Sequence, residues 1–353
     1  MAETKTSVII GVDTHKRTHT VAAISVTGER LDYAVFDACA DGYRQALKWA
    51  QSFGTVLRAG IESTGHYGAG LCFSLKASGI EVYDVYAPDK KRRRLHGKED
   101  HEDAFQAAQA ALSLTRCAVA KDKNEVIEAA VELENAYRLA CRQRTACLNA
   151  LKASIIKLPD HMRRRLEGKT DHDLIKTCSS LRAGTGNTGL PIGTVLALKH
   201  YARSVKSLGD DMKDLEREIT RYAEAFAPNT LALAGIGCHG AITLLGVAGL
   251  NIDRMRNDAA FAMLCGVSPI PVSSGNRHHH RLNRGGNRRA NSVLHIMAVT
   301  RIRLFPDTRA FIDKKMSEGK SKSDGIRALK RYLARETLGA LRADFALFGV
   351  DVK

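Results

Sequence analysis

Residues 7–86 alternate between β-rich and helix-forming stretches, and this order constrains the fold more than any other feature of the chain. Three runs rich in β-branched and aromatic residues follow one another, with short polar turns between them: SVIIGVD (7–13), HTVAAISV (19–26) and RLDYAVFD (30–37). Two helix–strand pairs come next, at 43–53, 55–64, 67–77 and 80–86. Consecutive strands that lead into alternating helices and strands predict an α/β domain with a mixed sheet.

Three fold classes share this order: RNase H-like folds, actin-like ATPases and sugar kinases. The first strand ends on Asp13, a carboxylate that follows an apolar run. Actin-like kinases need a glycine directly after this aspartate, because the backbone there wraps a phosphate. Here Thr14, His15 and Lys16 follow instead. The sequence therefore favours an RNase H-like N-terminal domain.

Four carboxylates stand where they can reach one edge of that sheet. Asp13 and Glu62 lie near the ends of strands, whereas Asp100 and Asp103 open a helix, three residues apart and so on one face. Each alone has an ordinary structural use, in a turn, at a helix N-terminus or on a half-exposed surface. Four together repel one another unless a cation lies between them, and oxygen ligands suit Mg²⁺. Their order predicts a two-ion site that clamps a phosphodiester.

The charge balance predicts a polyanionic partner. The 353 residues include 54 Lys and Arg against 38 Asp and Glu, a formal net charge of +16, so nucleic acid is the first candidate and a merely basic enzyme the alternative. Residues 276–303 contain no acidic residue, and we interpret their first half as a nucleic-acid-facing loop. A basic run at 90–94 is usually a solvated face, but here it precedes the acidic helix. The predicted phosphate contacts are Arg277, Arg281, Arg284, Arg288, Arg289, Lys90, Lys91, Arg92, Arg93 and Arg94.

Ser273 and Ser274 precede Gly275 and lead into the arginine-rich stretch. A Ser-Ser-Gly sequence is most often only a turn. A serine hydroxyl becomes a nucleophile when a base or a metal activates it, and arginines beside it stabilise charge on a phosphoryl group. The histidines at 278–280 are assigned no metal, because consecutive histidines cannot all face one ion in regular structure.

The rest of the chain predicts three domains, at 1–122, 123–228 and 229–353. Residues 124–158 contain no Gly or Pro, and a later helix has heptad spacing. With the Gly-rich break at 178–191, these helices predict an antiparallel hairpin that pairs protomers, or a plain helical subdomain. The mainly helical C-terminal domain places Gly235–Gly237 between apolar segments, as in a helix-hairpin-helix. The heptad positions are Leu208, Met212, Leu215, Ile219, Tyr222 and Phe226.

Compartment signals point to a soluble, cytoplasmic protein with no membrane contact. The eight cysteines form no CxxC pair and suit reduced thiols. The first ten residues lack a signal-peptide pattern, and no apolar run approaches the ~18 residues of a membrane span. Association with a prokaryotic nucleoid is expected.

Four short motifs appear in order over nearly the whole chain: GVDTHK (11–16), IESTGHYG (61–68), GKEDHEDA (97–104), and AGIG (234–237) followed by LCGVSPIPVSSG (264–275). In this combination the sequence resembles insertion-sequence transposases of the IS one-ten family, which are bridge-RNA-guided recombinases. The resemblance implies a RuvC-like domain in which Asp13, Glu62, Asp100 and Asp103 form a DEDD metal tetrad. It also implies that Ser274, directly before Gly275, attacks DNA and forms a phosphoserine link. Glu99, in place of the family's small hydroxyl residue, is a departure.

The resemblance further implies the partners. Donor and target double-stranded DNA would be cut and rejoined with Mg²⁺, and a structured non-coding RNA would pair with both. The two halves of the active site would come from different protomers of a homo-oligomer, a dimer or a tetramer. Two alternatives stay open: a RuvC-like nuclease or junction resolvase that hydrolyses with water, and a non-catalytic nucleic-acid-binding protein.

Overall fold

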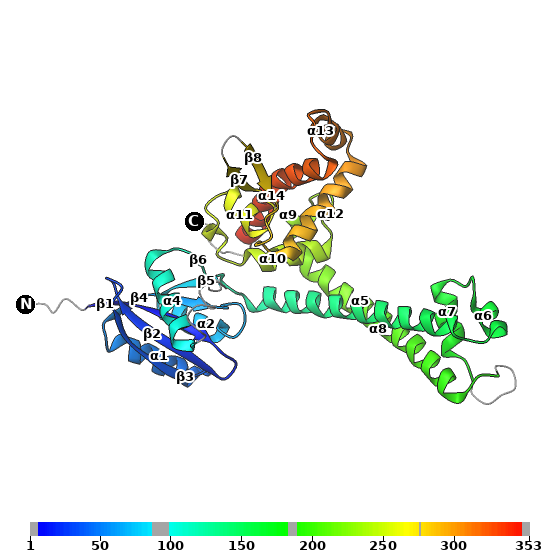
Figure 1. Cartoon of the computed structure of the whole chain (residues 1–353), viewed down its shortest axis with the longest axis horizontal. Helices are drawn as coiled ribbons and strands as arrows, with labels where there is room; N and C mark the ends of the chain where they lie inside the picture. The colour runs from blue at the N-terminus through cyan, green and yellow to red at the C-terminus, as the bar shows by residue number, and fades with distance from the viewer. Residues whose placement is uncertain (1–5, 87–98, 183–188, 275–276, 348–353) are drawn as a thin grey trace, which may run out of the picture. The chain divides into compact units, whose positions relative to one another are not determined.

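The computed structural model describes residues 6–86, 99–182, 189–274 and 277–347. The chain forms two compact units, residues 1–122 and 123–353 (Figure 1). A separate domain beginning at residue 229 stays a prediction. None of the described helices is long and apolar enough to cross a membrane.

The first unit is a mixed six-stranded sheet with helices on both faces (Figure 1). Its strand order is β3-β2-β1-β4-β5-β6, in which β1 runs antiparallel to β2 and parallel to β4. This is the RNase H-like arrangement that the sequence predicts; the short last strand was not anticipated. The elements are β1 (Ser7–Thr14), β2 (Thr18–Ser25), β3 (Arg30–Asp37), α1 (Ala40–Gln51), β4 (Thr55–Glu62), α2 (Ala69–Ala77), β5 (Glu81–Val85), α4 (Asp100–Ser113) and β6 (Cys117–Val119).

Strand β1 is buried on both faces, which explains its continuous apolar run. Val8, Ile10 and Val12 point into a core that α1 and α2 close. Ile9 points the other way, against α4. Gly11 and Asp13 share the face of Ile9, because side chains alternate along a strand. Asp13 therefore lies on the side of the sheet that α4 covers.

The second unit begins with the predicted helical hairpin, whose two long helices lie side by side (Figure 1). The Asn124 side chain caps the first of them by accepting from the backbone N–H groups of Val126 and Ile127. Among the six heptad positions of the returning helix, Ile219 is buried and the others are half-buried. The hairpin consists of α5 (Glu125–Ile156), α6 (Asp160–Leu166), α7 (Asp171–Ser179) and α8 (Ile192–Phe226).

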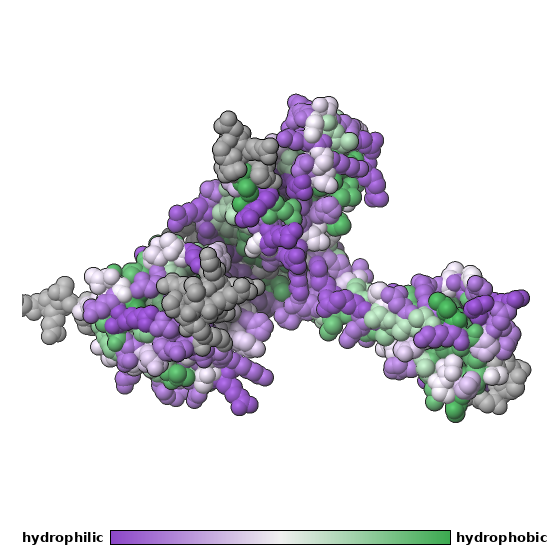
Figure 2. Space-filling view, viewed as in Figure 1, coloured by the Kyte–Doolittle hydropathy of each residue, from purple (hydrophilic) through white to green (hydrophobic). Residues whose placement is uncertain are grey.

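Hydrophobic side chains gather at the hairpin tip, over α6 to α8 (Figure 2). Ile156, Ile192 and Leu196 are all more than half exposed there. At its other end the hairpin shares a core with the C-terminal helices, to which α5 contributes Ile127 and Ala130.

The C-terminal part is mainly helical, as predicted. A single helical turn and an 11-residue helix flank the Gly235–Gly237 segment. The arginine-rich stretch is not a plain loop, however, because Arg277–Arg281 forms a strand paired with Ile270–Ser274. Gly-Asn between two such runs is a hairpin signal that favours this pairing. The elements are α9 (Pro228–Leu231), α10 (Cys238–Ala248), η1 (Ile252–Arg254), α11 (Asp258–Leu264), β7 (Ile270–Ser274), β8 (Arg277–Arg281), α12 (Arg288–Leu304), α13 (Pro306–Ser317) and α14 (Lys322–Leu347).

Candidate metal centre

Helix α4 lies directly against the sheet because two glycines leave room for its backbone. A Cβ on Gly11 of β1 would lie 2.0 Å from the carbonyl oxygen of Ala104, and one on Gly60 of β4 would lie 2.2 Å from that of Ala107. Since van der Waals contact needs more than 3 Å, neither position accepts a side chain. This close packing brings the first turn of α4 over the ends of β1 and β4.

Each of these glycines stands two residues before an acid: Gly11 before Asp13, and Gly60 before Glu62. In a strand, residues two apart share a face, so both acids point toward the side of α4. Gly11 pairs with Gly60, and Val12 with Ile61. Continuing this register by one residue puts Asp13 beside Glu62, on strands about 4.8 Å apart.

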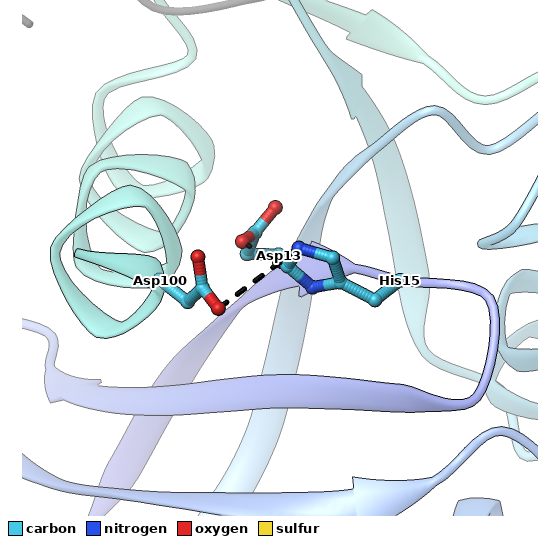
Figure 3. Close-up of side chains that lie close together, drawn as sticks. All are labelled: Asp13, His15 and Asp100. Atoms are coloured by element: carbon cyan, nitrogen blue, oxygen red, sulfur yellow. Dashed lines mark ion pairs between the residues drawn. The ribbon is translucent and has the colours of Figure 1, made fainter. Parts of the chain in front are cut away.

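Asp13, His15 and Asp100 form a close group (Figure 3). One potential ligand atom from each lies within 4.8 Å of the other two. The His15 Nδ1 atom is 3.7 Å from Asp13 Oδ2, and Nε2 is 3.9 Å from Asp100 Oδ2. Asp13 is only 8% exposed, whereas Asp100 and His15 reach solvent. The structure thus brings together two of the four predicted acids, from a strand and a helix far apart in the sequence.

The other two predicted acids, one on the neighbouring strand β4 and one on α4, are not part of this close group. Glu62 is half-buried at the end of β4, where the Thr14 hydroxyl donates to its carbonyl oxygen at 3.0 Å. The chain turns sharply after it: Ser63 is left-handed, with φ 62°, and Thr64 donates twice to Asp84 on β5. Asp103 is 7% exposed in the first turn of α4.

The remaining charged residues of that turn face β3. Glu102 accepts two hydrogen bonds from the guanidinium of Arg30, at 2.5 and 2.8 Å, and these raise the pKa of Arg30. The His101 ring stacks on Tyr33, with centroids 4.8 Å apart. Helical geometry therefore points adjacent residues in two directions: Asp100 lies near Asp13, whereas His101 and Glu102 contact β3.

A divalent cation fits the close group. Burying a carboxylate as deeply as Asp13, with a second carboxylate nearby, costs free energy that a cation offsets. Carboxylate oxygens and imidazole nitrogens are common ligands of such ions. The sequence motifs indicate Asp13 and Asp100 but not His15. The two glycines carry a signal that the motifs do not use, a Gly-x-acid pattern in both strands.

The structure describes only some of the residues predicted to contact nucleic acid. Arg281, Arg284, Arg288 and Arg289 are all exposed. The side chains of residues 273–280, including Ser273, Ser274 and Arg277, lie outside the described residues, and so do Lys90, Lys91, Arg92, Arg93 and Arg94 altogether.

The segment that leads into α12 is firmly held. A Cβ on Gly286 would lie 2.2 Å from the backbone nitrogen of Gly266, so this turn packs on the end of α11. The Asn287 side chain then caps α12 by accepting from the N–H groups of Arg289 and Ala290. Arg288 and Arg289 thus stand at the positive end of a helix dipole, an arrangement that favours a bound anion.

Comparison with known protein families matches two segments of the chain. A transposase model of the DEDD IS110 type matches residues 10–157. A second model, described as a transposase of the IS116/IS110/IS902 family, matches residues 229–313. No curated protein matches the chain. The two models cover more than half of the sequence, in the order of the motifs that resemble IS one-ten, and the chain belongs to the IS110 family of insertion-sequence transposases.

Proposed function

We propose that this transposase cuts and rejoins double-stranded DNA with Mg²⁺ and a serine nucleophile, under the direction of a structured non-coding RNA. The observation that carries the proposal is the convergence of Asp13 and Asp100 with His15 at one end of the sheet. A basic protein that collects carboxylates at one point is suited to holding cations against a polyanion.

Asp13, Glu62, Asp100 and Asp103 are the residues that would hold the ions. Bound there, two divalent cations would neutralise charge on a scissile phosphate. Asp13 and Glu62 stand on neighbouring strands, and the short distance between β1 and α4 fixes both relative to Asp100 and Asp103. Such rigid supports keep the carboxylates in place before DNA arrives.

Ser274 is the proposed nucleophile. Its oxygen would form an ester bond to phosphorus while the bond from phosphorus to one DNA sugar oxygen breaks, and the serine proton would pass to a base. Attack by a free DNA hydroxyl on that ester would release Ser274 and rejoin the strand. Ser274 ends β7, opposite Arg277 in the register. The choice of Ser274 over Ser273 rests on the family resemblance and on adjacency to Gly275.

Covalent chemistry is tested by an adduct. The full-length protein is incubated with cognate DNA and Mg²⁺, and products are separated under denaturing conditions. We expect a protein–DNA adduct from the native chain and from Ser273→Ala, and none from Ser274→Ala. DNA cleavage without any adduct would instead favour hydrolysis by a resolvase-type nuclease. An adduct retained in Ser274→Ala would assign the nucleophile elsewhere.

The exposed arginines would grip DNA phosphates, and salt dependence tests this. Each phosphate that a basic side chain contacts makes the slope of log affinity against log salt steeper by roughly one unit. We therefore expect Arg281→Ala, Arg284→Ala and Arg288→Ala each to flatten the slope by about this amount. An unchanged slope would remove that residue from the interface. Arg309→Ala, outside the predicted set, is the matched control.

RNA guidance, oligomerisation and nucleoid association rest on the family resemblance and on the net charge of +16. If a non-coding RNA chooses the target, recoding its pairing segment moves insertion to the recoded site while the protein stays the same. Insertion that ignores such recoding would refute guidance.

A further inference from the structure

His15 stands outside the predicted DEDD set, yet its ring nitrogens lie within 4 Å of carboxylate oxygens of two members of that set. We propose that His15 is a direct ligand of the ion held by Asp13 and Asp100, which makes this position a mixed nitrogen–oxygen site. The inference rests on the proposed metal centre and extends it by one ligand and by a metal preference.

The spacing suits coordination better than hydrogen bonding. Hydrogen bonds between such atoms have lengths near 2.7–3.2 Å, and the ring nitrogens of His15 are 3.7 and 3.9 Å from the nearest carboxylate oxygens. Ligands of one ion, each about 2.1 Å from it, can be up to about 4.2 Å apart. Each contact falls below that limit, although the two use different ring nitrogens. One ligand atom from each of the three residues lies within 4.8 Å of the other two, so one ring nitrogen and two carboxylate oxygens can surround a single ion after small adjustments.

The backbone of His15 is fixed before any ion binds. Residues 15–17 form the short turn between β1 and β2, in which the His15 N–H donates to the Thr18 carbonyl oxygen at 3.0 Å. The Arg17 carbonyl oxygen accepts from the N–H of Ala38, at the end of β3, at 2.8 Å. Only the side-chain torsions of His15 remain to be ordered on binding, which lowers the entropic cost.

The ring itself is accessible. Its side chain is 41% exposed, and within the described residues neither ring nitrogen makes a hydrogen bond. An ion from solvent can therefore meet His15 and Asp100 first, with the buried Asp13 behind them.

A nitrogen ligand changes which ion binds best. Carboxylates alone suit Mg²⁺, Ca²⁺ and Mn²⁺, whereas imidazole favours ions later in the transition series, in the order Mn²⁺ < Co²⁺ < Zn²⁺. Removing His15 should weaken Mn²⁺ binding about tenfold and Mg²⁺ binding less. His101 provides a matched control, because it adjoins Asp100 in sequence but stacks on Tyr33.

Pulsed electron paramagnetic resonance of Mn²⁺ in the full-length protein tests the proposal without reference to DNA cleavage. We expect ¹⁴N coupling to the bound Mn²⁺ in the native chain and in His101→Ala. In His15→Ala, and in the bulkier His15→Gln should alanine perturb the turn, Mn²⁺ should still bind, more weakly and without that coupling.

The outcomes separate the ligand from the centre. Mn²⁺ binding that Asp13→Asn abolishes, but that shows no ¹⁴N coupling in the native chain, overturns the role of His15 and leaves the metal centre intact. Coupling that survives in both His15 variants also overturns it. Mn²⁺ binding indifferent to Asp13→Asn overturns the centre itself, and the ligand with it.

Discussion

Two buried aspartates of this chain have opposite surroundings. Asp344 of α14 is fully buried and accepts four hydrogen bonds, two from Asn229 and two from Thr230, at 2.6–3.0 Å. Asp13 of β1 is nearly as buried, but its neighbours include another carboxylate, Asp100, and a histidine beyond hydrogen-bond distance. Asp344 has the environment of a structural residue, whereas the surroundings of Asp13 suit the metal-ligand role that we propose for it.

Glu134 of α5 agrees with this distinction. It is 2% exposed and lies between the guanidinium of Arg138 and the Nδ1 atom of His239, the latter at 2.6 Å. Like Asp344, this buried carboxylate has positive or hydrogen-donating groups on its own chain. A buried carboxylate among hydrogen-bond donors fastens helices together, whereas a buried carboxylate close to a second carboxylate is favourably placed for a cation.

The largest effect should come from removing charge at the metal centre. Asp13→Asn or Asp100→Asn should lower DNA cleavage by at least about a thousandfold, because bound metal supplies several kcal/mol of transition-state stabilisation. Stability should hold or rise, since one of two like charges is removed. Asp41→Asn on α1 is the exposed control. An active Asp13→Asn protein would contradict the site.

Removing Asp344, the buried aspartate among hydrogen-bond donors, should instead lower the stability of the protein. Asp344→Ala leaves four donors without this acceptor, two of them on the buried Thr230, and should cost about 3 kcal/mol. Urea unfolding followed by far-ultraviolet circular dichroism reports this, because the second unit holds the long helices. Asp214→Ala on α8, where the carboxylate is 73% exposed, should cost less than about 0.5 kcal/mol. An equal loss of stability in Asp344→Ala and Asp214→Ala would contradict the structural role of Asp344.

Disturbing the packing that places Asp100 should affect both stability and metal binding. Gly11→Ala forces α4 from the sheet and should cost about 2–3 kcal/mol, with weaker Mn²⁺ binding. Trp49 is the only tryptophan, so its fluorescence follows the first unit alone. Gly65→Ala, with no atom within 4 Å of the added Cβ, should change neither property. If the Gly11→Ala protein is destabilised but binds Mn²⁺ as tightly as the native chain, the packing of α4 on the sheet does not control metal binding.

The smallest effect concerns His19, a buried histidine on the face of the sheet opposite α4. Burial lowers its pKa below the usual histidine value of 6.5. The unfolded chain therefore binds this proton more readily, so the contribution to stability is complete above pH 6.5 and is lost as pH falls below it. In His19→Phe, which keeps a ring against Tyr43, the unfolding midpoint followed by Trp49 fluorescence should fall less steeply as pH decreases below 6.5. An unchanged dependence on pH would mean that other groups cause the loss of stability in acid.

Most of the fold of the first unit followed from local pattern, because its first five strands are runs of β-branched, aromatic and other apolar residues separated by turns or helices. Asp13 at a strand end and Asp100 at a helix start could be anticipated for the same reason. What joins them could not: the contact of α4 with β1 and β4 depends on the absence of two side chains, at Gly11 and Gly60, and hydrophobic pattern does not report an absent atom.

The sequence does not indicate the role proposed for His15, because that role depends on where a turn residue points, which spacing along the chain does not determine. β8 was missed because its residues, RHHHR, lack the apolar alternation by which strands are recognised, and pairing with β7 holds them through the backbone.

Anomalous scattering from crystals of the full-length protein soaked in Mn²⁺ would locate the proposed ion. We expect a peak within coordinating distance of both Asp13 and Asp100, and its loss in Asp13→Asn. A Mn²⁺-saturated crystal with the two carboxylates ordered, and no peak between them, would refute the metal centre.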